Sequence, residues 1–247
     1  MAGHSKWKNI QHRKGAQDAK RGKIFTKLIK EIVVAVKTGG PDADSNPRLR
    51  LALQNAKGAN MPKDNIERAI KKASGDDDAD YVEVTFEGYG PDGIAIFVEA
   101  TTDNNMRTVA NVRSYFNKFN GSLGKDGCLQ FIFDRKGVFT LNAEGLDEEE
   151  FMLEMIDAGA EDVEFEDGIV TITTEMEDFG NVQKALSDMD IEPTESGLQR
   201  IPTTNKKTDA KNFQTVMKLI DKLEDDDDVQ KVYHNIEFDE ALFSEAG

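Results

Sequence analysis

The segment VEFEDGIVTIT at residues 163–173 decides the fold of the region around it. Two short runs rich in Val, Ile, Phe and Thr flank Glu166-Asp167-Gly168, a pattern typical of two strands joined by a tight turn. We therefore predict a β-hairpin whose strands are Val163–Phe165 and Ile169–Thr173.

The elements on both sides of this hairpin complete a known motif. Upstream, Val138–Leu141 has the composition of a strand, and residues 147–158 have the spacing of an acidic amphipathic helix. Downstream, a helical pattern covers residues 178–189, and a strand follows near 191–200. The order β-α-β-β-α-β is the ferredoxin-like split βαβ arrangement. The side chains expected inside the first helix are Phe151, Met155 and Ile156.

A second α/β block lies on either side of this unit in the sequence. Its first elements are expected to be two strands, a helix and a strand, at residues 82–86, 94–100, 105–119 and 128–133. A helix over 209–224 and a strand over 229–236 would complete the block, so that the β-α-β-β-α-β unit is inserted into it. The alternative is two independent units in series.

The N-terminal region has a helical pattern with Gly and Pro at its boundaries. Apolar spacing begins at Ile24 and stops at Gly39-Gly40-Pro41, while residues 4–23 are expected to form an arm that is mobile or loosely helical. A second helix starts at Asn46-Pro47 and a third at Pro62. These elements predict a small helical domain.

The complete prediction is an α+β fold with three domains, namely an N-terminal helical domain and two ferredoxin-like α/β domains, one inserted in the other. The expected boundaries are 1–80 for the basic arm and helical domain, 81–135 with 204–247 for the discontinuous α/β domain, and 136–203 for the inserted domain.

Charge is distributed very unevenly along the 247 residues, whose net charge is −16. Residues 1–75 contain 17 Lys and Arg against 6 Asp and Glu, a net charge of +11, whereas the remainder contains 14 against 41, a net charge of −27. Such a dipole steers a polyanion toward one end of the molecule and repels it from the other. The alternative is that the N-terminal region simply has basic, solvated faces.

The sequence argues against a catalytic or metal centre. Gly88, Gly90 and Gly93 match G-x-G-x-x-G, but they lead into a strand rather than a helix, so we predict a hairpin turn and no nucleotide site. The three His residues and Cys128 lack the spacing of metal ligands, and Cys128 is expected to be a small core residue. We predict no enzyme activity, no cofactor, no metal and no catalytic residue.

The composition also bears on compartment. A single cysteine excludes an internal disulfide and fits a reducing compartment. No apolar run has the length of a membrane span, so no membrane partner is expected. Residues 1–30 are basic and nearly free of acids, as in a mitochondrial presequence, but they hold only one Ser and one Thr and continue into a helical pattern.

The expected nucleic-acid contacts lie in the first 30 residues, where nine Lys and Arg stand against one acid, Asp18. Cations neutralise phosphates and release counterions without reading sequence. Trp7 can stack on a base or pack on the helical domain, and His12 suits a phosphate or base contact. The predicted binding residues are Lys6, Trp7, Lys8, His12, Arg13, Lys14, Lys20, Arg21, Lys23 and Lys27. A second basic set comprises Arg48, Lys57, Lys63, Arg68, Lys71 and Lys72.

Physical chemistry leaves two targets open, duplex DNA contacted through its backbone and structured RNA, including ribosomal RNA. A further hypothesis is a protein-interaction module whose acidic portion binds a basic partner.

Several short sequence motifs are distributed along the whole chain. These strings are GHSKW at 3–7, QDAKRGK at 17–23, NMPKDNI at 60–66, TDN at 102–104 and DDVQKVYHN at 227–235. In these strings the sequence resembles the YebC/PmpR family. It departs at residues 117–121, where NKFNG replaces an expected glycine pair, and this departure concerns a turn rather than function.

The resemblance implies a three-domain protein with an inserted domain and a cytoplasmic regulator of gene expression. The family is usually described as DNA-binding transcriptional regulators, whereas its mitochondrial relatives resemble the translational activator of cytochrome oxidase and bacterial members are linked to the ribosome. We therefore predict a monomeric DNA-binding transcriptional regulator, with a ribosome-associated translation factor that binds ribosomal RNA as the alternative.

Overall fold

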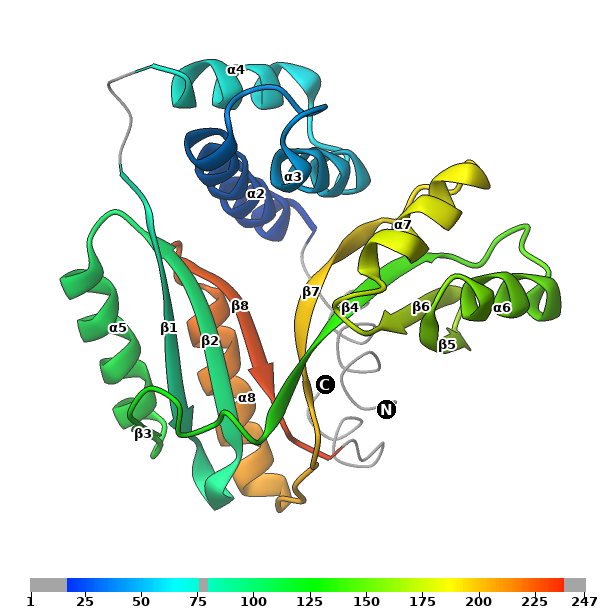
Figure 1. Cartoon of the computed structure of the whole chain (residues 1–247). Helices are drawn as coiled ribbons and strands as arrows, with labels where there is room; N and C mark the ends of the chain where they lie inside the picture. The colour runs from blue at the N-terminus through cyan, green and yellow to red at the C-terminus, as the bar shows by residue number, and fades with distance from the viewer. Residues whose placement is uncertain (1–16, 76–79, 238–247) are drawn as a thin grey trace. The chain divides into compact units, whose positions relative to one another are not determined.

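The computed structural model describes residues 17–75 and 80–237 (Figure 1). The fold class is α+β, as the sequence predicts, with two four-stranded sheets. Within the described residues, one compact unit comprises the chain as far as Lys27 with residues 80–134 and 201–237, and the other comprises 28–75 and 135–200. The three-domain boundaries remain a prediction. None of the helices in the described ranges has both the length and the apolar character needed to cross a bilayer.

The sheet of the second unit contains the hairpin that the sequence predicts. Its strand order is β5-β6-β4-β7, which is the order of the ferredoxin-like arrangement. Asp167 and Gly168 both have positive φ, 53° and 80°, and this conformation lets β5 turn directly into β6. The strands are β4 (Phe133–Asn142), β5 (Ala160–Glu166), β6 (Ile169–Thr174) and β7 (Glu195–Pro202), and the helices are α6 (Glu148–Asp157) and α7 (Phe179–Asp188).

The core of this sheet is formed by β4 and β6 against α6 and α7. Phe139, Phe151 and Ile172 are fully or almost fully buried in it, together with Met155. The prediction that Ile156 is buried was wrong, because its side chain is 52% exposed. Helix α6 covers the sheet with a narrow face, so the positions beside Met155 point outward.

The sheet of the first unit joins segments from both ends of the chain. Its order is β3-β1-β2-β8. Strands β1 to β3 precede the strands of the other sheet in the sequence, and β8 follows them. Helices α5 and α8 pack through Phe116, Phe213 and Ile220 on the face that carries Ile96 and Val98. The strands are β1 (Val82–Tyr89), β2 (Ala95–Thr102), β3 (Ser122–Leu123) and β8 (Val229–His234), and the helices are α5 (Asn105–Lys118) and α8 (Ala210–Glu224).

The predicted strand at Cys128–Phe133 was wrong. Residues 126–132 form turns, and the strand that pairs with β1 is the short β3. The carboxylate of Glu87, which is buried, accepts hydrogen bonds from the backbone N–H groups of Gly127 at 2.8 Å and Leu129 at 2.6 Å. These bonds hold the segment in turns and take donors that a strand would need. Cys128 is therefore exposed, not a core residue.

Three helices form the N-terminal part: α2 (Gln17–Gly39), α3 (Pro47–Gly58) and α4 (Lys63–Ala73). Helix α2 begins at Gln17 rather than near Ile24, so the last residues of the predicted arm belong to it. Buried Asn46 ends α2 and starts α3. Its side-chain amide donates to the carbonyls of Ala35 and Gly40, both at 2.8 Å, and its oxygen accepts from the N–H of Leu49 at 3.0 Å.

Helix α3 packs along β7, the edge strand of the second sheet. The side chain of Asn55 donates to the carbonyl of Ser196 at 2.8 Å and accepts from its N–H at 2.9 Å, as a neighbouring strand would. Gly58 approaches so closely that an added Cβ would lie 2.2 Å from the carbonyl oxygen of Thr194. The α3 side chains thus cover an edge that would otherwise be open to further pairing.

Candidate nucleic-acid interface

The ten predicted binding residues fall into three groups. Lys6, Trp7, Lys8, His12, Arg13 and Lys14 lie outside the described residues. Lys20 lies near the start of α2, where only the backbone is described. The side chains of Arg21, Lys23 and Lys27 are described, and Arg21 is exposed. Of the ten predicted residues, only these last three therefore have side-chain surroundings that can be described.

Lys23 and Lys27 contact the C-terminal end of α8, 197 to 202 residues away in sequence. Lys23 forms an ion pair with the Asp225 carboxylate and donates to the Asp225 carbonyl at 3.3 Å. Lys27 donates to the carbonyl of Glu224 at 3.0 Å. Burial lowers the pKa of Lys27, and the nearby charges of Glu224 and Asp225 oppose that effect. Two of the predicted phosphate-binding cations therefore already have acceptors within the chain, a carboxylate for Lys23 and a backbone carbonyl for Lys27.

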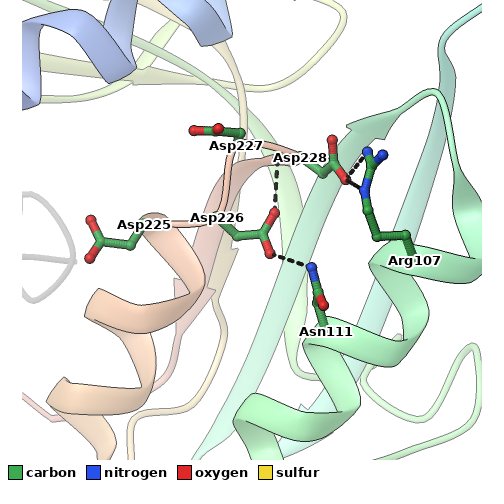
Figure 2. Close-up of a pocket in the computed structure, with 6 residues that line it drawn as sticks. All are labelled: Arg107, Asn111, Asp225, Asp226, Asp227 and Asp228. Atoms are coloured by element: carbon green, nitrogen blue, oxygen red, sulfur yellow. Dashed lines mark hydrogen bonds and ion pairs between the residues drawn. The ribbon is translucent and has the colours of Figure 1, made fainter.

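The run Asp225–Asp228 is more than a solvated acidic face. Asp228 is 4% exposed and accepts from the Arg107 guanidinium at 2.6 and 3.2 Å and from the Thr108 hydroxyl at 2.9 Å. Its own N–H donates to Asp226 at 2.9 Å. Helix α5 therefore fixes the loop that follows α8 (Figure 2).

Asp226 is held by the same helix. It accepts from Tyr115 Oη at 2.9 Å and Asn111 Nδ2 at 3.2 Å. Burial, followed by the hydrogen bond to Asp226, raises the pKa of Tyr115 to about 12. The hydrogen bonds to Asp228 and to Asp103 raise the pKa of Arg107, so this guanidinium stays charged.

A hollow of about 410 Å³ lies at this end of the first unit, lined by Arg107, Asn111 and Asp225–Asp228. In Figure 2 the carboxylates of Asp226 and Asp228 point toward α5, whereas that of Asp225 points away from it. In the part of the chain that the structure describes, no group of three His, Cys, Asp or Glu side chains is arranged to hold a metal ion. The arrangement suits cationic side chains, as Lys23 and Lys27 show.

The second basic set lies among acidic residues. Lys57 pairs with Glu192, Lys63 lies 3.5 Å from Glu67, and Arg68 bonds Asn65 and the Asp64 carbonyl. A shallow hollow of about 490 Å³ on α4 is lined by Arg68 and Lys71 together with Asp64 and Glu67. This surface therefore has both signs of charge.

The glycine-rich segment forms the predicted connection between two strands. Pro91–Gly93 is a single 3₁₀ turn between β1 and β2, and Asp92 has a positive φ of 57°. The Asp92 carboxylate accepts from Thr208 at 2.7 Å and Asn212 at 2.9 Å, which lowers its pKa. The loop thus anchors the start of α8.

Sequence reasoning missed the network around Asp226 and Asp228. Of the residues in this network, Asp103 and Asp228 lie in strings that carry the resemblance described above, at 102–104 and 227–235. Their separation of more than 100 residues gives no local periodicity that would pair them. The presence of Asp103 and Asp228 in these two strings was the one available signal.

The fold and this interface define a class: an α+β protein with two four-stranded sheets whose N-terminal helix carries exposed and ion-paired cations. The chain belongs to the TACO1/YebC family, since residues 5–76 match the family's N-terminal domain and residues 81–236 its second and third domains.

Relatives extend over nearly the full length. A "Probable transcriptional regulatory protein" of Amoebophilus asiaticus is 57% identical over 239 residues, covering 96% of this chain and 98% of the relative. One from Clostridium botulinum is 54% identical, covering 98% and 99%. The crystal structure of a conserved hypothetical protein from Aquifex aeolicus superimposes with a TM-score of 0.84 at 43% identity, covering 92% of this chain and 95% of that one.

Proposed function

We propose that this chain is a cytoplasmic, DNA-binding transcriptional regulator that binds as a monomer. The observation that carries this is the charge of +11 on residues 1–75 against −27 on the remainder. Backbone phosphates attract such a region strongly, whereas the negative charge of the remainder repels them. The names of the curated relatives, probable transcriptional regulatory proteins, support the same role. The role is one of binding, not catalysis.

The contacts we propose are the ten predicted residues from Lys6 to Lys27. Lys and Arg of this set neutralise phosphates, and Trp7 stacks on a base where the duplex is distorted. Arg21 is exposed and ready for such a contact. Lys23 and Lys27 must first leave the end of α8.

Binding to duplex DNA at several salt concentrations tests this function. We expect the variant K6Q/R13Q/K14Q to bind every duplex more weakly and to lower the log–log salt slope by roughly one unit for each lost phosphate contact. The matched control, K125Q/K211Q/K218Q, removes the same charge from exposed lysines elsewhere and should keep most of the slope.

Sequence preference separates a transcriptional regulator from a general polyanion binder. We expect some duplexes from a random pool to bind more tightly than the pool average at matched salt. Equal affinity for every duplex would contradict the proposed function. Tighter binding of structured ribosomal RNA than of any duplex would instead assign the chain to translation.

A further inference from the structure

The C-terminal end of α8 is built to attract cations. The last carbonyls of a helix carry partial negative charge, and here a run of four Asp follows them. Lys27 bonds the Glu224 carbonyl, and Lys23 bonds both the carboxylate and the carbonyl of Asp225. Both lysines belong to the proposed nucleic-acid interface.

The site is held in place independently of these lysines. Asp226 and Asp228 are bound by Tyr115, Thr108 and Arg107 of α5, so the loop keeps its shape. Asp225 is not part of that network, and Figure 2 shows its carboxylate directed away from α5. The loop therefore offers the Asp225 carboxylate and the end of a helix to Lys23 and Lys27.

We propose that the C-terminal end of α8, with Asp225, competes with nucleic-acid phosphates for Lys23 and Lys27 and so weakens binding to any single polyanion. This inference rests on the proposed function and adds a regulatory contact to it. A phosphate must displace an internal acceptor at two of the ten contacts, the Asp225 carboxylate at Lys23 and the Glu224 carbonyl at Lys27. Non-specific complexes, which depend on phosphate contacts most, lose the largest share of their stability.

The exposure of the pair fits a contact that exchanges. The side chains of Lys23 and Asp225 are 40% and 60% exposed, so water and salt screen the ion pair. Release requires only rotation about lysine side-chain bonds. A fully buried pair would be too costly to break for a reversible competitor.

Removing the internal anion tests the inference. Asp225→Asn should tighten binding of a random-sequence duplex by about two- to fivefold, the range expected when a half-exposed ion pair is lost from the free protein. Asp126→Asn is the control, because Asp126 is exposed in the same unit and its substitution removes the same charge. Any general reduction of repulsion will be present in both variants.

A double-mutant cycle then isolates the contact. In a Lys23→Gln background, Asp225→Asn should have no larger effect than Asp126→Asn, because the lysine that the carboxylate holds is gone. Thermal unfolding of each variant checks that the loop is intact, and unchanged midpoints are expected.

The outcomes are distinct. Equal effects of Asp225→Asn and Asp126→Asn in the wild-type background would overturn the competition and leave DNA binding standing. The competition would also be overturned if Asp225→Asn kept its full effect in the Lys23→Gln background. Absence of binding by every variant, including the wild type, would overturn the proposed function itself and the competition with it.

Discussion

Asp228 connects α5 to the start of β8 through a carboxylate that is 4% exposed. It accepts from Arg107 and Thr108, so its removal takes one buried acceptor from each of these donors, one of which is charged. We expect Asp228→Ala to lower the free energy of unfolding by about 2 kcal/mol, measured by urea denaturation. Asp126→Ala, at an exposed position, should change it by less than about 0.5 kcal/mol. Comparable losses in both variants would contradict a special role for Asp228.

Tyr115 reports on the same network through its ionisation. Its pKa is raised from 10.0 to about 12 by burial and by the hydrogen bond to Asp226. The neutral phenol is the favoured form in the folded protein, so this contribution to stability is complete below pH 10 and is lost as the pH rises through 12. Absorbance titration should show a tyrosine component that ionises near pH 12, and Tyr115→Phe should remove this component. A late step that survives the substitution would assign it to another tyrosine.

At the scale of elements, Asn46 holds the α2–α3 junction. One side chain bonds two carbonyls at the end of α2 and caps α3, and Gly39 leaves the space it occupies. Asn46→Ala should lower the free energy of unfolding by about 1–3 kcal/mol, because the cap of α3 and the hydrogen bonds to the carbonyls of Ala35 and Gly40 are lost. Chemical denaturation measures this, with exposed Asn117→Ala on α5 as the control. Similar small losses in both would show that the junction does not depend on the cap.

The elements also show what the sequence could and could not predict. The hairpin at 163–173 and the helix starting at Asn46-Pro47 were predictable, because turn and capping residues act within a few positions. The turns at 126–132 were not, since the carboxylate that holds them, Glu87, is some 40 residues away. The partners of Lys23 and Lys27 were hidden for the same reason. Charge indicates that a lysine can bind an anion, but only the fold determines which anion lies beside it.

At the scale of the whole molecule, the residues that stabilise the two sheets and the residues expected to bind nucleic acid lie in different parts of the sequence. The buried cores of both sheets are built from residues after position 80. Residues 1–16, in contrast, supply Lys6, Lys8, Arg13 and Lys14 but few apolar side chains. Deleting them should therefore weaken binding to duplex DNA far more than it affects unfolding.

The expected size follows from the phosphate contacts that are lost. Four cations, each neutralising one phosphate, correspond to a decrease in the salt slope of roughly 3–4 units for duplex DNA. Binding of the truncated chain, measured by fluorescence anisotropy across a range of salt concentrations, should show this decrease, while its thermal midpoint stays within about 2 °C of the full chain. If the truncated chain keeps the original salt slope, the polyanion binds to another surface of the protein. A sharp decrease of the thermal midpoint would instead show that the first 16 residues contribute to the stability of the fold.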